Sequence, residues 1–115
     1  MKEKFITIVG QNHYFGMKPF KIGQVVKLVK EPDNSCDYEA IKVTLPYIGT
    51  VGYVANSSST VYQGTHSAGR LYDKIGNVAY AKVMFVTHSS VIALVGAGTK
   101  DEYKKFEDPD DIVHF

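Results

Sequence analysis

The chain has one cysteine, no tryptophan and no long hydrophobic run among its 115 residues. The single cysteine, Cys36, excludes an internal disulfide and a cysteine-based zinc site, which fits a reducing compartment. No apolar segment approaches the roughly 20 residues of a membrane-spanning helix. Residues 1–10 pass from charge directly into a strand-like run that is too short for a signal peptide. We therefore expect a soluble, unprocessed, cytoplasmic protein.

The chain also lacks an excess of charge of either sign. Its 13 Lys and Arg face 12 Asp and Glu, giving a formal net charge of +1, so no overall field indicates a polyanionic or membrane partner. The distribution is uneven, because residues 1–30 hold six lysines and one acid, whereas residues 100–115 hold six acids and three lysines. The length suits a single domain. We expect this domain to span residues 1–98, followed by a charged, acidic tail over residues 99–115.

Short runs of β-branched and aromatic residues predict six β-strands. They cover residues 5–9, 25–29, 40–45, 50–55, 77–87 and 91–95. One short helix is expected within residues 56–75, where apolar side chains recur at helical spacing, namely Ala68, Leu71, Tyr72 and Ile75. The pattern predicts a mainly β fold: a small, partly open, OB-like or SH3-like antiparallel β-barrel with one or two short helices. Beyond residue 98 we expect a frayed terminus, in which Ile112, Val113 and Phe115 could add a strand or dock on a partner.

Few residues could support catalysis or metal binding. Four of the five acids in the predicted domain beyond Glu3 lie in one turn-like stretch, residues 30–43, where such side chains more often close turns than catalyse. The four histidines are far apart and form no i, i+4 pair, so no metal-ligand motif exists. Cys36 has no cationic neighbour to support a thiolate, and the glycines of VGAGTKDE do not follow the phosphate-loop order. We predict no enzyme activity, no metal and no cofactor.

A loop between the first two predicted strands suits binding better. It groups amide and aromatic side chains, namely Asn12, His13, Tyr14 and Phe15, within a basic part of the chain that carries Lys18, Lys21, Lys27 and Lys30. Aromatic rings beside cations are typical of grooves for single-stranded nucleic acid. Packed aromatics beside an ordinary solvated lysine face would give the same pattern, and composition does not decide between the two.

Three stretches, VGQNHYFG, VVKLVKEPDNSCDYEAIKV and TVGYV, together resemble the HIRAN domain. That domain occurs at the N-terminus of Rad5-like and helicase-like-transcription-factor ATPases and as stand-alone bacterial proteins. The resemblance covers residues 5–95. It implies an OB-like β-barrel that binds DNA and, in the eukaryotic members, captures the 3′-hydroxyl end of a single strand between two loops.

The resemblance carries two residue roles over to this chain. Tyr14 matches an aromatic of the family's first loop, and Asp37 matches the acid at the terminal sugar hydroxyl. Other positions depart: Asn12 replaces an Arg that reaches the DNA end, His13 replaces a Tyr, Cys36 replaces a stacking Tyr, and Tyr53 stands where a His contacts the strand. Each lost contact of this kind is worth about 1–3 kcal/mol.

Residue chemistry leaves Asp37 with two readings. Pro32 fixes one backbone dihedral and the side chains of Asp33 and Asn34 tie down the turn, which would orient Asp37 toward the Tyr14 loop. A carboxylate repels a phosphate chain, so Asp37 fits a hydroxyl terminus. It fits equally well as a cap for residues 38–40.

The sequence therefore predicts a non-enzymatic nucleic-acid-binding module for single-stranded DNA, with a preference for a free 3′-hydroxyl end. The expected binding residues are Tyr14, His13, Asn12, Tyr53 and Asp37, with Lys18, Lys30 and Lys42 as phosphate neighbours. The alternative is a protein-interaction or oligomerisation module that keeps the fold and has lost DNA-end binding. Besides nucleic acid, a separate helicase or ATPase and self-association are the partners considered, and no membrane is expected.

Overall fold

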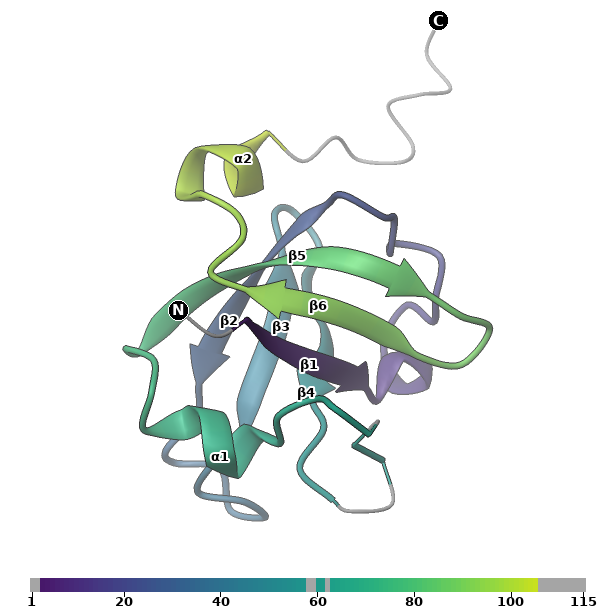
Figure 1. Cartoon of the computed structure of the whole chain (residues 1–115). Helices are drawn as coiled ribbons and strands as arrows, with labels where there is room; N and C mark the ends of the chain where they lie inside the picture. Colours follow the sequence, from purple (N-terminus) through teal and green to yellow (C-terminus); the bar gives the residue numbers. More distant parts are fainter. Residues whose placement is uncertain (1–2, 58–59, 62, 106–115) are drawn as a thin grey trace, which may run out of the picture.

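The computed structural model describes residues 3–57, 60–61 and 63–105, and six of its segments are β-strands. They are β1 (Lys4–Val9), β2 (Val25–Lys30), β3 (Ile41–Leu45), β4 (Gly49–Val54), β5 (Val78–Val86) and β6 (Val91–Val95). All neighbours are antiparallel, and the order β1-β4-β3-β2-β5-β6 closes into a barrel (Figure 1). The mainly β fold class is confirmed. The barrel is closed where the sequence led us to expect a partly open one, because β1 pairs with both β4 and β6.

Alternation of apolar and polar residues directs the strands toward one core. In β3, Ile41, Val43 and Leu45 are buried, whereas Lys42 and Thr44 lie on the outer face. Inward side chains of the other strands, such as Ile6, Leu28 and Val83, complete the core. Each such buried side chain contributes roughly 1.5–3 kcal/mol through the hydrophobic effect.

Gly52 allows the close approach of β1 to β4. A Cβ at this position would lie 2.8 Å from the Val9 carbonyl oxygen and 2.9 Å from Cγ2 of Ile8. Because glycine leaves that space to β1, Val9 pairs with Tyr53 and Ile8 with Val54. The contact places the outward side chain of Tyr53 beside the segment that follows β1.

A short helix closes one end of the barrel. Helix α1 (Ala68–Tyr72) begins at Ser67, whose side chain accepts a hydrogen bond from the Arg70 backbone NH, and it buries Ala68 and Leu71 in the core. It is shorter than the predicted pattern, which ran to Ile75. That residue still packs against the core without being helical.

A second helix, α2 (Lys100–Lys104), lies where we expected a frayed terminus. Thr99 and Glu102 form a capping box, in which each side chain bonds the other residue's backbone NH. The Tyr103 ring lies 5.6 Å from the Tyr80 ring on β5, so the helix rests on the outside of the barrel. Residues Ile112, Val113 and Phe115, considered above for a further strand, fall outside the described residues. Within those described, no helix has the length and apolarity needed to cross a membrane.

Candidate nucleic-acid interface

Tyr14 and Tyr53 meet on the outer surface where β1 ends. A single 3₁₀ turn, η1 (Gln11–His13), follows β1 and is held by buried Gln11, whose side-chain amide donates a 2.7 Å hydrogen bond to the Ile8 carbonyl. The Tyr14 ring then lies 6.3 Å from the Tyr53 ring, tilted by 37°. Tyr14 is 42% exposed, so part of its side chain is accessible to a ligand.

Glu31, the residue after β2, is the centre of the polar contacts made with Tyr53 of this pair. Its Oε1 accepts a 2.7 Å hydrogen bond from the Tyr53 hydroxyl and a 3.3 Å bond from the Asn34 amide. Its Oε2 lies 3.9 Å from the Lys42 ammonium group. Burial, followed by the hydrogen bond to Glu31, raises the pKa of the Tyr53 phenol further above its usual value, which favours the protonated hydroxyl that donates to Glu31.

Asn34 organises the turn that leads from Glu31 to Asp37. Its side-chain oxygen accepts hydrogen bonds from the backbone NH groups of Cys36, at 2.9 Å, and Asp37, at 3.1 Å. The Asn34 NH in turn donates to the Glu31 carbonyl at 3.1 Å. The stretch EPDNSCD is therefore a rigid turn built around one asparagine, as expected of a side chain that bonds backbone groups two and three residues on.

Asp37 is engaged by the protein on both carboxylate oxygens. Oδ1 accepts from the Glu39 backbone NH and Oδ2 from the Asn56 side-chain amide, each at 2.9 Å. Asn56 also accepts a 2.8 Å bond from the NH of Gly69 in α1. The capping role that we considered for Asp37 is thus present. Because each carboxylate oxygen has two lone pairs, both oxygens keep capacity for one further donor.

These contacts form a continuous chain across the surface, which we call the Tyr14–Asp37 network. It runs from Tyr14 through the ring of Tyr53 to Glu31, from Glu31 through Asn34 to Asp37, and ends at Asn56. The two loops singled out in the sequence are therefore connected, although Tyr14 and Asp37 do not share a hydrogen bond within the described part of the chain.

The lysines expected near phosphates lie in three different settings. Lys42 belongs to the network through Glu31. Lys30 is directed elsewhere, because its ammonium group donates a 2.8 Å bond to the Ile75 carbonyl and lies 4.5 Å from the centre of the Tyr72 ring. Lys18 is exposed on the loop between η1 and β2 and makes no ion pair among the described residues. Within the described part of the chain, Lys42 is the one of these three lysines that pairs with a residue of the network.

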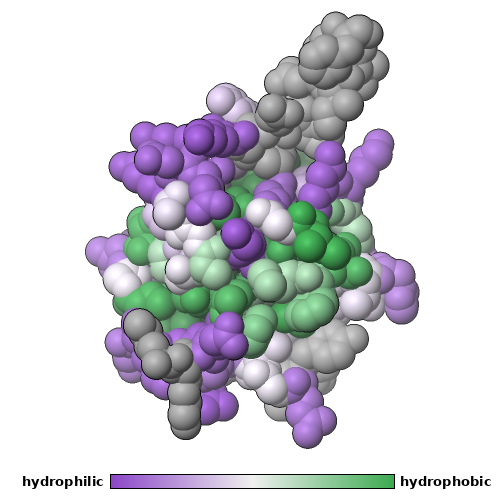
Figure 2. All heavy atoms as spheres, turned by 45° about the horizontal axis from the view of Figure 1, so that its top comes forward, coloured by the Kyte–Doolittle hydropathy of each residue, from purple (hydrophilic) through white to green (hydrophobic). Residues whose placement is uncertain are grey.

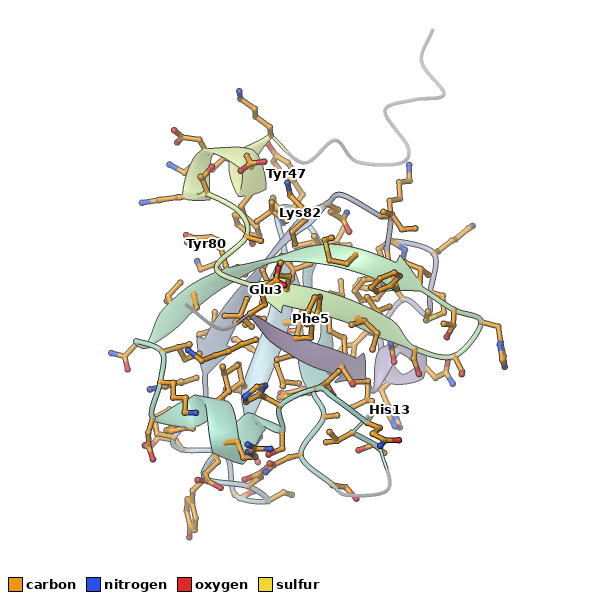
Figure 3. All side chains as sticks on the ribbon, viewed as in Figure 1. Glu3, Phe5, His13, Tyr47, Tyr80 and Lys82 are labelled. Carbon is orange, nitrogen blue, oxygen red and sulfur yellow. The ribbon has the colours of Figure 1, made fainter. Side chains whose placement is uncertain are left out.

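The remaining predicted residues lie on the exposed surface around the network. Asn12, His13 and Cys36 are all exposed, and Figure 3 shows His13 at the margin of the barrel on the segment after β1. An open pocket of about 410 Å³ adjoins the network, lined by Lys30, Glu31, Pro32, Asp33, Asn34 and Tyr53. No group of three His, Cys, Asp or Glu side chains gathers to hold a metal in residues 3–57, 60–61 and 63–105.

Sequence reasoning had assigned no role to Glu31, Gln11 or Asn56. Glu31 stood inside the quoted EPDN stretch, but its bond to Tyr53 depends on the pairing of β3 with both β2 and β4. Asn56 follows β4 in a serine-rich segment that gave no signal beyond capping. Gln11 is a buried polar residue next to Gly10, a pattern that could have indicated a side chain tying down a turn.

Two solved structures share the fold. One is a protein from Lactobacillus plantarum, with a TM-score of 0.58 and 20% identity, the match covering 80% of this chain and 88% of the other. The second is the HIRAN domain of human HLTF, with a TM-score of 0.55 and 20% identity over 98% of this chain and 89% of that one. A search of curated proteins found no match.

A family model agrees with these likenesses and with the quoted motifs. The HIRAN domain model matches residues 2–71, which include β1 to β4, the EPDN turn and all of α1 except its last residue. The match spans more than half of the chain and contains every residue of the Tyr14–Asp37 network. The chain therefore belongs to the HIRAN domain family.

Proposed function

We propose that this protein binds nucleic acid, specifically single-stranded DNA with a preference for a free 3′-hydroxyl end. The Tyr14–Asp37 network carries the proposal, because it joins an exposed aromatic ring to a carboxylate with unused acceptor sites. Membership of a family of DNA-binding modules supports the general function. The preference for an end rests on the chemistry of Asp37.

The aromatic part of the site would hold a base. Exposed rings of Tyr14 and Phe15 lie on the segment after β1, and His13 adds a third ring close by. Stacking on such rings contributes about 1–3 kcal/mol per base and is indifferent to sequence, since every base has a π-face. We expect little sequence selectivity from this surface.

The carboxylate would distinguish the end of the strand from its interior. Asp37 can accept a hydrogen bond from a terminal hydroxyl, whereas it would repel a phosphate at the same place. The Lys42 ammonium group lies 3.9 Å from a Glu31 carboxylate oxygen, a distance typical of a weak surface pair, so it can turn to a backbone phosphate. The site would thus combine stacking, one cation and one hydroxyl acceptor.

The test is fluorescence anisotropy with a short single-stranded DNA that carries either a free or a phosphorylated 3′ end, at low and moderate salt. We expect tighter binding of the free end. Asp37→Asn should remove the preference while keeping a side-chain oxygen for the turn. Asp33→Asn is the matched control, because Asp33 is an exposed acid of the same turn. Equal binding of both ends by the unmodified protein would defeat end capture, and no binding would defeat the function.

A second candidate function, self-association, is favoured by one surface. Figure 2 shows a band of apolar side chains over the face formed by β5, β6 and β1. Phe85 is 57% exposed there and, with Phe5 and Ile92, lines a shallow groove of about 220 Å³. We propose a second copy of the chain as its occupant. Light scattering after size exclusion should then give a dimer that Phe85→Ser dissociates, and a monomer at all concentrations would refute this candidate.

A further inference from the structure

The outer face of the barrel continues from the Tyr14–Asp37 network toward α2. Lys42 on β3 is paired with Tyr53 on β4, and two residues further along β3 lies Thr44. Thr44 pairs with Lys27 on β2, and Lys27 pairs with Tyr80 on β5. Two residues along a strand span roughly 7 Å, about the spacing of successive phosphates in an extended single strand. The next outward row therefore carries one cation, Lys27, and one aromatic ring, Tyr80, and Lys82 lies two residues further along β5.

Helix α2 occupies this second row with complementary groups. The Tyr103 ring lies against Tyr80, its hydroxyl is 3.2 Å from Oγ1 of Thr44, and the Lys27 ammonium group lies 5.9 Å from its centre. Glu102 places a carboxylate oxygen 3.8 Å from the Lys82 ammonium group. Figure 3 shows Tyr80 and Lys82 on β5 beside α2.

Each of these contacts has the chemistry of a bound nucleotide. The Tyr103 ring packs on Tyr80 at a tilt of 57° near the Lys27 ammonium group, in a place where a base could pack, and the Glu102 carboxylate meets Lys82, as a phosphate would. We propose that the face formed by Lys27, Tyr80 and Lys82 is a second part of the nucleic-acid surface, and that α2 is a displaceable cover over it. This inference rests on the proposed function. Displacement would lengthen the site from the Tyr14–Tyr53 pair across β3 and β2 to β5.

The attachment of α2 suits a cover that can detach. The chain is fixed up to Gly98, where a Cβ would lie 2.7 Å from Cγ2 of Val25, so this residue holds the connection close to β2. Beyond it, α2 has five residues, and none of them is buried. Its ion pair is accessible to solvent, since the side chain of Lys82 is 35% exposed and that of Glu102 is 48% exposed. Exposed pairs of this kind are weak and screened by salt, so detachment at the Gly98–Thr99 connection leaves the barrel core intact.

Two variants of the full chain, Glu102→Gln and Tyr103→Ala, test the cover by anisotropy with single-stranded DNA. Glu102→Gln removes the charge that meets Lys82, and glutamine can still complete the capping box. Asp101→Asn is the matched control, because it removes one negative charge from the same helix without touching Lys82. We expect tighter binding for Glu102→Gln than for Asp101→Asn.

Tyr103→Ala should have the larger effect, on the order of fivefold tighter binding or more, because Tyr80 becomes free to stack. Lys27 and Lys82 would each become free to neutralise one phosphate. The slope of log affinity against log salt should then become steeper by about 1.4, since each phosphate neutralised on a single strand contributes roughly 0.7. The double variant Lys27→Gln, Tyr103→Ala should lose part of the gain in affinity and part of the increase in salt slope. Circular dichroism checks that each variant keeps the barrel.

The outcomes separate this inference from the function on which it rests. If the unmodified chain and Asp101→Asn bind DNA and the two cover variants bind with the same affinity and salt slope, α2 is not a cover and the proposed function stands. If Tyr103→Ala binds more weakly, α2 is itself part of the site and the inference is overturned. If no form binds, the proposed function fails and the inference fails with it.

Discussion

The hydroxyl of Tyr53 on β4 donates a 2.7 Å hydrogen bond to Glu31 at the end of β2, across the intervening strand β3. The bond joins an aromatic ring of the surface to the first residue of the EPDN turn. It therefore holds in one place two segments that are 22 residues apart in the chain. The orientation of the Tyr14–Tyr53 pair and the path of the turn depend on each other.

Removing this hydroxyl should weaken both the fold and the site. Tyr53→Phe keeps the ring beside Tyr14 but leaves Glu31 with one donor fewer. A hydrogen bond to a partly exposed carboxylate is worth about 1 kcal/mol, so the free energy of unfolding in urea should fall by that amount. Tyr38→Phe, on a side chain that is 77% exposed, should leave it unchanged. An unchanged stability for Tyr53→Phe would mean that the bond to Glu31 is not populated in solution.

Truncating Tyr14 should affect binding rather than stability. Tyr14→Ala removes the exposed ring, and the loss of one stacking platform is worth about 1–3 kcal/mol, or roughly 5- to 150-fold in dissociation constant. Anisotropy of single-stranded DNA measures the loss, with Tyr38→Ala as the control for removal of an exposed tyrosine. Similar affinities for the two variants would place the DNA elsewhere on the protein.

Asn34 should be the most sensitive position of the EPDN turn. Asn34→Ala leaves the NH groups of Cys36 and Asp37 without their acceptor and removes a donor from Glu31. By analogy with helix caps, we expect a loss of about 1–2 kcal/mol in urea unfolding. Ser35→Ala, at the exposed neighbouring residue, is the control. If both variants unfold alike, the turn does not depend on the asparagine side chain.

Gly52 should tolerate no side chain, since a Cβ there would lie 2.8 Å from the Val9 carbonyl oxygen. Gly52→Ala should force β1 away from β4 and cost about 1–3 kcal/mol, as overpacking of a core does. Gly76→Ala is the matched control, because its Cβ would meet nothing closer than 3.9 Å. Thermal unfolding compares the two, and a Gly52→Ala chain as stable as Gly76→Ala would contradict the tight β1–β4 contact.

His66 should make stability depend on pH. Burial, then the positive charges of Arg70, Lys74 and Lys4, lower the pKa of His66 below 6.5, and its Nδ1 is buried without a hydrogen-bond partner among the described residues. The unfolded chain therefore binds more protons than the folded one just below pH 6.5. The stabilisation is complete above that pH and is lost as the pH falls toward the folded-state pKa.

Urea midpoints at pH 7.5 and 5.5 measure this dependence. The midpoint of the unmodified chain should fall more between the two values than that of His66→Gln. His88→Gln, at an exposed histidine, should behave like the unmodified chain. An equal fall for all three would show that other groups set the pH dependence.

The fold could be predicted well because it depends on local patterns. Alternation in β3 and β4 and the apolar runs of β1 and β6 gave the right strands within a few residues. Helix α2 was missed, although its capping box can be seen in TKDE, because a helix of five residues needs the distant contact of Tyr103 with Tyr80. Such a contact follows from barrel register, which no short stretch contains.

The site was predictable only in part, for a similar reason. The motif identified Tyr14 and Asp37 as site residues. Glu31, which connects them in the network, takes its role from the pairing of β3 with β2 and β4. Lys30 was grouped with the phosphate neighbours because it is close to the motif in sequence. In the structure its ammonium group bonds the Ile75 carbonyl and lies over the Tyr72 ring, while the residue also lines the pocket beside the network, and its role toward phosphate stays a prediction.

Closure of the barrel also constrains when the chain can fold during synthesis. Strand β1 leaves the ribosome first, yet its longer pairing is with β6, whose residues are made about 90 positions later. A nascent chain that ends at residue 71, where the family match stops, exposes the unpaired edges of β1 and β2. Contacts so distant in sequence form slowly. The barrel can therefore close only after β6 has been synthesised, and until then its edge strands depend on protection from aggregation.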